Sequence, residues 1–131
     1  MAIEIQASDN QGNTWSVIKT VEDGFFPAII KDIIGRMWLF YYKTMELAGV
    51  EKGYIFEIHS DDEGTTWSEE ISLALEQGTP PSEVEPAESK IGVTMDVCGR
   101  MYITFWGNGV KKFAYSDDIY AAVPTWTVKT R

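Results

Sequence analysis

The nine residues "SDDEGTTWS" at Ser60–Ser68 repeat, with three substitutions, the earlier stretch "SDNQGNTWS" at Ser8–Ser16. A third and decayed copy, "SDDIYAAVPTW" at Ser116–Trp126, keeps the Ser, the Asp, the Thr and the Trp but lacks the Gly. The three copies begin 52 and 56 residues apart. A period of this length indicates a repeat architecture with several strands in each unit.

A second pair of similar segments supports the repeat. "DIIGRMWLFYY" begins at Asp32 and "DVCGRMYITFW" begins at Asp96, 64 residues later. The pattern Asp-x-x-Gly predicts a tight turn, because Asp binds backbone amides and Gly accepts a positive φ. The Arg that follows is expected to pair with a carboxylate of a turn. The predicted turn residues are Asp32, Gly35, Arg36, Asp96, Gly99 and Arg100.

Short alternating or β-branched runs, separated by Gly, Pro, Asp and Asn, predict an all-β fold. The 131 residues are 44% hydrophobic and 13% aromatic, which favours one packed domain. Residues 69–77 have some helical spacing and form the alternative, a short helix. The ten expected strands are Ile3–Ala7, Trp15–Val21, Pro27–Lys31, Met37–Thr44, Tyr54–His59, Trp67–Leu73, Ile91–Met95, Met101–Trp106, Lys111–Tyr115 and Trp126–Thr130.

The strand after the first Asp-x-x-Gly turn is apolar on both of its sides. Every residue from Met37 to Tyr42 is apolar or aromatic. A strand in a sheet with one solvated face would instead alternate with polar residues. The pattern therefore predicts that sheets are stacked on both sides of this strand.

The charge of the chain argues against polyanionic partners. The net charge is −9 and the pI is about 4.5. Nucleic acids and anionic membrane surfaces attract clusters of Lys and Arg, and only Lys111–Lys112 approaches such a cluster. We therefore expect neither nucleic acid nor a membrane as a partner.

The N-terminal residues and the apolar stretches bear on the location of the protein, and the single cysteine bears on disulfide formation. Residues 1–10 lack the basic region and apolar run of a signal peptide, and no apolar stretch reaches about 18–20 residues. We expect a soluble protein of the cytoplasm or of a virion. Cys98 cannot form an internal disulfide and is expected to be a buried free thiol.

The repeated phrase fits the pattern Ser-x-Asp-x-Gly-x-Thr-Trp, which is called the Asp-box or bacterial neuraminidase repeat; Asn10 stands where that pattern has Asp. The chain therefore resembles the sialidase-like β-propellers, as a short and non-catalytic member. In that family the phrase forms the turn between the third and fourth strands of a blade. The side chain of Asp or Asn is expected to accept hydrogen bonds from turn amides, and the Trp to pack beneath the turn. The structural residues so marked are Ser8, Asn10, Gly12, Thr14, Trp15, Ser60, Asp62, Gly64, Thr66, Trp67, Ser116, Asp118 and Trp126.

The resemblance implies antiparallel, four-stranded, propeller-type blades, about two and a half in each chain. Within a single domain, 1–131, we expect a half-blade hairpin (1–23), a blade (25–75), an acidic Pro-rich loop (76–89) and a blade (90–131). The loop is a linker or, alternatively, an arm that reaches a partner. Propellers typically have 4–8 blades, so this open wheel is expected to be completed by oligomerisation or by docking on another protein; the remaining alternative is a fold that departs from a wheel.

The residues do not support catalysis, and we expect no cofactor and no metal. A sialidase site, as the resemblance implies, uses three arginines, an acid/base Asp and a Tyr–Glu pair. The three arginines of this chain are Arg36 and Arg100, which belong to the predicted turns, and the final Arg131. No two carboxylates stand out as a glycosidase pair. Residues 60–64 lack the alternating acids of a calcium loop, and His59 has no partner at zinc-ligand spacing.

The sequence therefore predicts a non-enzymatic structural or assembly protein, for instance a phage virion decoration or tail component, that forms a homo-oligomer or joins a larger assembly. The first alternative is a carbohydrate-binding module, in which aromatic rings stack on sugar faces. A degenerate glycoside hydrolase fragment is the second alternative. The candidate stacking residues are Trp38, Tyr42, Tyr102 and Trp106, although their alternation within strands argues for burial.

Overall fold

The protein is built from antiparallel β-strands. The computed structural model describes residues 2–76, 91–107, 110–122 and 124–130, and these ranges contain no helix, hence none that could cross a membrane. The predicted all-β class is confirmed. The strands are β1 (Ala2–Ala7), β2 (Ser16–Glu22), β3 (Phe25–Lys31), β4 (Met37–Leu47), β5 (Val50–Ser60), β6 (Ile71–Glu76), β7 (Gly92–Met95), β8 (Met101–Gly107), β9 (Val110–Ser116) and β10 (Thr127–Thr130).

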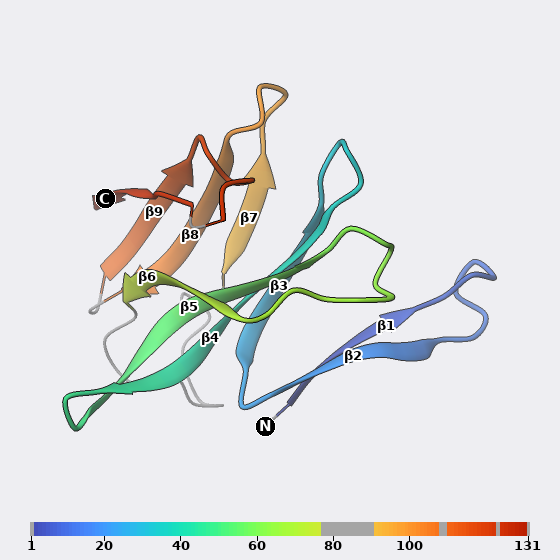
Figure 1. Ribbon diagram of the computed structural model, residues 1–131, viewed down its shortest axis with the longest axis horizontal. Coiled ribbons are helices and arrows are strands. Elements are labelled where there is room, and N and C mark those ends of the chain that lie inside the picture. Colours follow the sequence, from blue (N-terminus) through green and yellow to red (C-terminus); the bar gives the residue numbers. More distant parts are fainter. Residues whose placement is uncertain (1, 77–90, 108–109, 123, 131) are drawn as a thin grey trace.

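The strands form three sheets that lie face to face (Figure 1). A two-stranded hairpin, β1–β2, is followed by a four-stranded sheet, β3–β6, and by a second four-stranded sheet, β7–β10. Each strand pairs with its neighbour in the chain, and every pair is antiparallel. The sheet β3–β6 lies in the centre, with one face on the hairpin and the other on β7–β10.

β4 is buried on both faces, as its sequence predicts. The side chains of residues 38–42 have exposed fractions between 0% and 2%. Trp38, Phe40 and Tyr42 pack in the core shared with β7–β10, whereas Leu39 and Tyr41 pack in the core shared with β1–β2. Because full burial of a large apolar side chain contributes about 1.5–3 kcal/mol, this strand is a major source of stability.

Several strands differ in extent from the sequence prediction. β4 and β5 continue beyond the core as a hairpin whose strands pair up to Leu47 and Val50, since each strand satisfies the backbone of the other. β6 begins at Ile71, four residues later than expected. The helical alternative is wrong for residues 69–76, because this segment pairs with the edge of β5 and places Leu73 and Leu75 in the core.

β3 begins two residues before its predicted start and contains an irregularity. The pairing with β4 shifts between Phe25 and Ala28. Pro27, which has no amide hydrogen to donate, lies at this shift, and Phe26 has a φ of 51°. β3 is an edge strand of its sheet, and edge strands tolerate such bulges.

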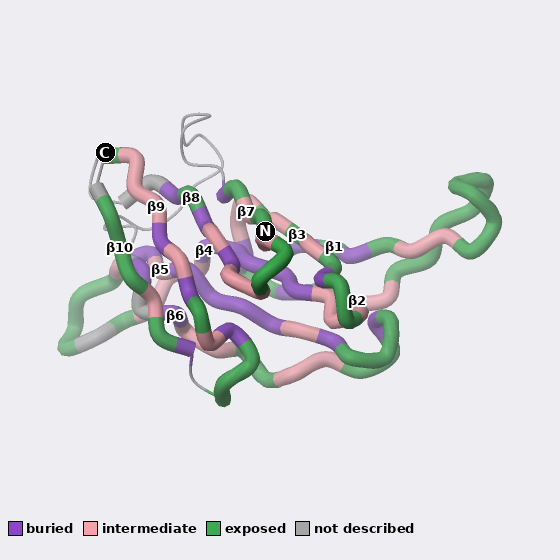
Figure 2. The backbone as a smooth tube through the Cα atoms, turned by 90° about the horizontal axis from the view of Figure 1, so that it is seen from above, coloured by how far each residue is buried: buried purple, intermediate pink, exposed green. Residues whose placement is uncertain are grey.

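Two side chains are more exposed than the sequence analysis expects. Cys98 is exposed and not buried, because it lies in the tight turn between β7 and β8. Trp15, expected to pack beneath its turn, is 60% exposed. The turn of the β1–β2 hairpin projects beyond the other two sheets, so the indole has little surface to cover it (Figure 2).

Gly64 provides a test of the contact between the hairpin and the central sheet. Its φ is 89°, and an added Cβ would lie 2.5 Å from Cδ1 of Ile18 on β2. Gly49 has a similar φ of 79° but open space around it. We expect Gly64→Ala to lower the free energy of unfolding by about 2 kcal/mol and Gly49→Ala by about 1 kcal/mol, measured by urea denaturation.

The difference between these two glycines isolates the packing contribution. Ile18→Val removes the Cδ1 atom, so it should restore part of the stability when it is combined with Gly64→Ala. Equal losses for Gly64→Ala and Gly49→Ala, with no recovery in the double variant, would contradict the observed contact.

Candidate functional site

The turn between β5 and β6 is closed by the side chains of the repeated phrase. Asp62 Oδ1 accepts hydrogen bonds from the Thr66 amide and the Ser60 hydroxyl, each at 2.8 Å. The Ser60 hydroxyl oxygen accepts a hydrogen bond from the Gly64 amide at 2.8 Å. Trp67 donates its indole N–H to the Gly64 carbonyl at 3.0 Å. Each residue type of the phrase therefore has a place in one hydrogen-bonded turn.

The turn between β1 and β2 has the same geometry with an amide in place of the acid. Asn10 Oδ1 accepts a hydrogen bond from the Thr14 amide at 2.9 Å, and its Nδ2 donates to the Thr14 hydroxyl at 2.7 Å. Trp15 donates to the Gly12 carbonyl at 3.1 Å, although the ring is largely exposed. Asn10 therefore makes the same contacts as Asp62, although the bond to the Thr hydroxyl is reversed, because Asp62 accepts this bond from Thr66.

The longer loop between β9 and β10 keeps only part of this arrangement. Asp118 accepts hydrogen bonds from Ser116 and from the Thr125 amide, each at 2.8 Å. Trp126 Nε1 is buried and has no hydrogen-bond partner among the described residues. In the other two turns the partner of this atom is the carbonyl of the Gly that the third copy lacks. The decay of the phrase thus leaves Trp126 Nε1 without a partner in the part of the chain that the structure describes.

The two Asp-x-x-Gly turns are closed in the same way. Asp32 Oδ1 accepts hydrogen bonds from the amides of Ile34 and Arg36, at 3.0 and 2.9 Å. Asp96 Oδ1 accepts the equivalent bonds from Cys98 and Arg100, both at 3.0 Å. The glycines of these turns, Gly35 and Gly99, have φ values of 99° and 90°, which other residues adopt only with strain.

Each turn arginine pairs with an acid of the neighbouring hairpin turn. Arg36 Nε lies 2.7 Å from Asp61, and Arg100 Nε lies 2.6 Å from Asp117. The sequence predicts such pairing but not these partners. One feature of the sequence could have identified these partners: an Asp follows the first Ser in all three copies of the repeated phrase. The pairing of β4 with β5 and of β8 with β9 brings Asp61 and Asp117 beside the arginines.

Tyr120 joins the two four-stranded sheets, and the sequence analysis does not identify it. Its hydroxyl donates to Asp32 Oδ2, which also accepts the indole N–H of Trp38 at 3.0 Å. Arg36 lies over both rings, 5.1 Å from the Trp38 centroid and 5.2 Å from the Tyr120 centroid. Burial and the Asp32 carboxylate raise the pKa of Tyr120 to about 12, so the phenol remains a donor at neutral pH.

An acid and a histidine form a pair beneath this cluster. Glu57 is 1% exposed at its side chain and lies 3.3 Å from Nδ1 of His59. Burial raises the pKa of Glu57, although the nearby His59 opposes this effect. The His59 ring packs against Trp38, with centroids 5.1 Å apart. Glu57 lies inside the stack of sheets, whereas the His59 side chain is 21% exposed.

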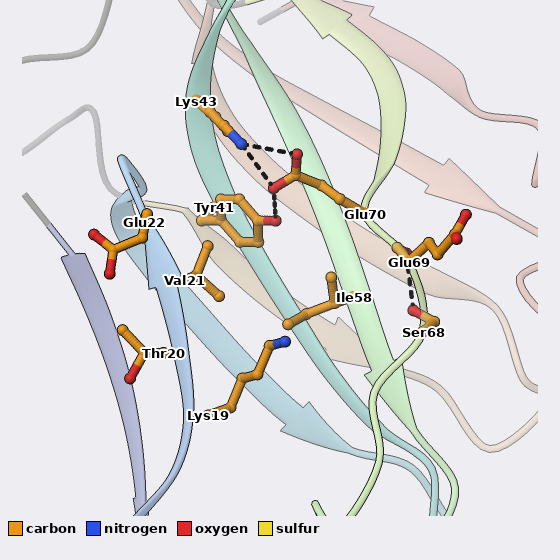
Figure 3. A pocket seen from close by; sticks show the side chains of 10 residues that line it. All are labelled: Lys19, Thr20, Val21, Glu22, Tyr41, Lys43, Ile58, Ser68, Glu69 and Glu70. Carbon is orange, nitrogen blue, oxygen red and sulfur yellow. Dashed lines mark hydrogen bonds and ion pairs between the residues drawn. The ribbon is translucent and has the colours of Figure 1, made fainter.

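A groove of 340 Å³ lies between β2, β4 and the segment before β6 (Figure 3). Glu70 accepts a hydrogen bond from the Tyr41 hydroxyl and forms an ion pair with Lys43 at 3.0 Å. Burial and the Glu70 carboxylate raise the pKa of Tyr41 far above its usual range. A nucleophilic phenol would need the opposite shift, so this Tyr–Glu contact fits a structural hydrogen bond.

The aromatic residues considered for sugar stacking lie in different environments. Trp38 and Tyr42 have no exposed surface, so they cannot stack on a sugar and this expectation is wrong for them. Tyr102 is half-buried and its ring is 6.4 Å from that of Tyr115. The side chain of Trp106 and the final Arg131 lie outside the described residues. So does the predicted loop 76–89 except for Glu76, which belongs to β6.

Neither a search for metal-binding clusters nor a comparison with protein families assigns a function to these residues. Within the part of the chain that the structure describes, no three His, Cys, Asp or Glu side chains are grouped to hold a metal ion. No protein-family model matches the chain. The features with the most complete geometry are therefore the hairpin turns and the Asp32–Tyr120 contact between sheets.

The turn carboxylates predict how stability depends on pH. Hydrogen bonds from Thr66 lower the pKa of Asp62 to about 2, and similar bonds lower the pKa values of Asp96 and Asp118. Because these folded-state values lie below the usual 3.8, their stabilisation is complete above about pH 4 and is lost as the pH falls towards 2. Glu57, with its raised pKa, acts in the opposite sense. Thermal unfolding followed from pH 7 to pH 2 measures this dependence.

The chain supplies a matched control for that experiment. Because Asn10 accepts the same backbone hydrogen bond as Asp62 and also bonds the Thr hydroxyl, Asp62→Asn should cost little stability at neutral pH. The variant should also lose less stability than the native chain on acidification, since the ionisable group is gone. An unchanged pH profile would show that Asp62 does not contribute to it.

Tyr120→Phe tests the hydrogen bond between the two four-stranded sheets. Removal of the hydroxyl leaves Asp32 with one donor fewer, and we expect a loss of about 1–2 kcal/mol in the free energy of unfolding. Tyr102→Phe is the control, because its hydroxyl donates to Asp96 within a single sheet, and Asp96 is more exposed than the buried Asp32. A larger loss for Tyr102→Phe would argue against the role of Tyr120.

Proposed function

We propose that the protein is a non-enzymatic structural component of a larger assembly, such as the decoration or tail of a phage virion. In this proposal its sheets are propeller-type blades carrying Asp-box turns, as in sialidase-like proteins, and copies of the chain complete the stack. The observation that carries the proposal is the N-terminal sheet, which among the described residues has two strands where each of the other sheets has four.

The outer edge of β1 supports the proposal that further strands join the N-terminal sheet. β1 pairs with β2 on one side, and no described strand pairs with its other side. A groove of 240 Å³ runs beside this edge, and its lining includes Pro27 and Leu39. Ile29, which also lines the groove, is 50% exposed. Unpaired strand edges and exposed apolar surface favour association, which supports an assembling protein.

The polar residues of the structure support a building role over catalysis. Arg36 and Arg100 are each engaged by an acid, which leaves them poorly placed to grip a substrate carboxylate. The raised pKa of Tyr41 makes its phenol a weak nucleophile. The burial of Trp38 and Tyr42 removes two of the four rings considered for sugar stacking. Assembly is therefore the function that we propose.

The mass of the native protein in solution tests this function. One chain has a mass of 14.8 kDa. We expect analytical ultracentrifugation and light scattering at several protein concentrations to give a defined multiple of this mass, because closed symmetric oligomers are the common outcome of self-association. A folded monomer at every concentration would contradict the proposal.

A further inference from the structure

The outer face of the sheet β7–β10 corresponds, in the repeat, to a face of the central sheet that another sheet covers. When the two repeated segments are aligned with their offset of 64 residues, Tyr102 corresponds to Trp38 and Thr104 to Phe40. Trp38 and Phe40 pack against β7–β10 and have no exposed surface. Tyr102 is half-buried and Thr104 is exposed, and both point away from the core because the residues beside them are buried in it. The same side of the repeat is covered in one sheet and open in the next.

The two Asp-x-x-Gly turns show the same difference. Asp32 accepts hydrogen bonds from Trp38 in its own sheet and from Tyr120 in the neighbouring sheet. Asp96 accepts the first kind of bond, from Tyr102 at 3.2 Å. Among the described residues, none supplies Asp96 with a counterpart of Tyr120. Within the described residues, the sheet β7–β10 therefore has the internal turn contacts of the central sheet but not the contact from a neighbouring sheet.

Aromatic rings and lysines make up this end face. Tyr115 on β9 lies opposite Tyr102, and Phe113 lies opposite Thr104. Lys129 on β10 lies opposite Phe113, and Lys111 faces the same way because it is two residues away along β9. We call this surface the C-terminal face. It combines half-buried aromatic surface with positive charge.

The outer surface of the hairpin β1–β2, at the other end of the stack, carries the opposite charge. Residues 3 and 5 are buried against the central sheet, so Glu4 and Gln6 point outward, and Glu22 on β2 lies on their side. With the repeat offset of 52 residues, Glu4 and Gln6 correspond to Phe56 and Ile58, which are buried. We call this surface the N-terminal face. It is acidic, whereas the corresponding positions of the central sheet are apolar.

We propose that the N-terminal face of one copy binds the C-terminal face of a second copy, with Glu4 and Glu22 opposite Lys111 and Lys129. This inference rests on the proposed assembly function and assigns its interface. The two faces lie at opposite ends of the stack, so a single copy cannot pair them within itself (Figure 1). Complementary charges give such an interface specificity and also keep the separate copies soluble.

The extent of the aromatic surface fits a two-stranded partner. A two-stranded hairpin is narrower than this four-stranded face, and the outward side chains differ along it. Phe113 and Tyr115 on β9 are aromatic, whereas Gly92 and Thr94 on β7 are small and exposed. The contact is head to tail, so it generates a closed ring, or a filament where the rotation does not close.

Paired charge reversals test this assignment. Glu4→Lys with Glu22→Lys makes both faces basic, and Lys111→Glu with Lys129→Glu makes both faces acidic. We expect each double variant alone to associate about tenfold more weakly or worse, because like charges then meet. An equimolar mixture should associate again, since every contact joins an acidic face to a basic one. Ultracentrifugation gives the masses, and thermal unfolding shows that each variant is folded.

Glu46→Lys with Glu51→Lys is the matched control. These residues form an exposed pair near the end of the β4–β5 hairpin, and their reversal changes the net charge equally without touching either face. The native association should be retained in this variant. Thr104→Glu, a single exposed substitution in the C-terminal face, should weaken association without disturbing the core.

The outcomes separate the two proposals. Native oligomers that persist unchanged in both double variants, or variants that fail to recover on mixing although folded, would overturn the assigned faces and leave the assembly function standing. Native protein that remains monomeric would overturn both. Loss in each double variant, retention in the control and recovery in the mixture would establish the head-to-tail contact.

Discussion

The structure depends on the burial of β4 on both of its faces. Five consecutive large side chains of this strand, residues 38–42, are removed from water, and no single sheet can cover both sides of a strand. The hairpin β1–β2 must therefore lie on one side and the sheet β7–β10 on the other. This requirement orders the three sheets along one direction, and it leaves each terminal sheet with an outer face on which no other described strand packs.

Carboxylates and amides with many hydrogen bonds hold the turns that make this stack possible. Asp62, Asn10 and Asp118 close the hairpin turns, while Asp32 and Asp96 close the turns that lead into β4 and β8. The hydrogen bonds stabilise the ionised form of each Asp, so the same contacts that build the turns lower the pKa values. Asp32 also accepts a bond from Tyr120, which links local turn geometry to the contact between sheets.

Sequence reasoning identified features whose cause is local. The alternation of residue types located the strands, and the Asp and Gly residues located the turns, because both depend on a few neighbouring residues. It missed Tyr120, Asp61 and Glu70, whose partners are 25 or more residues away in the chain. It also misjudged Cys98, which lies in a tight turn, and Trp15, whose exposure depends on whether another sheet lies above it.

The amino-acid sequence by itself determined the all-β class, the tight turns and a central strand that water cannot reach on either side. These features follow from backbone sterics, from hydrogen bonds over four residues or fewer, and from the period of side chains along a strand. Only the tertiary structure decided which sheet covers which face, because burial is a property of surfaces that meet in space. It placed Tyr102 and Thr104 at an open end although Trp38 and Phe40, their counterparts in the repeat, are fully buried.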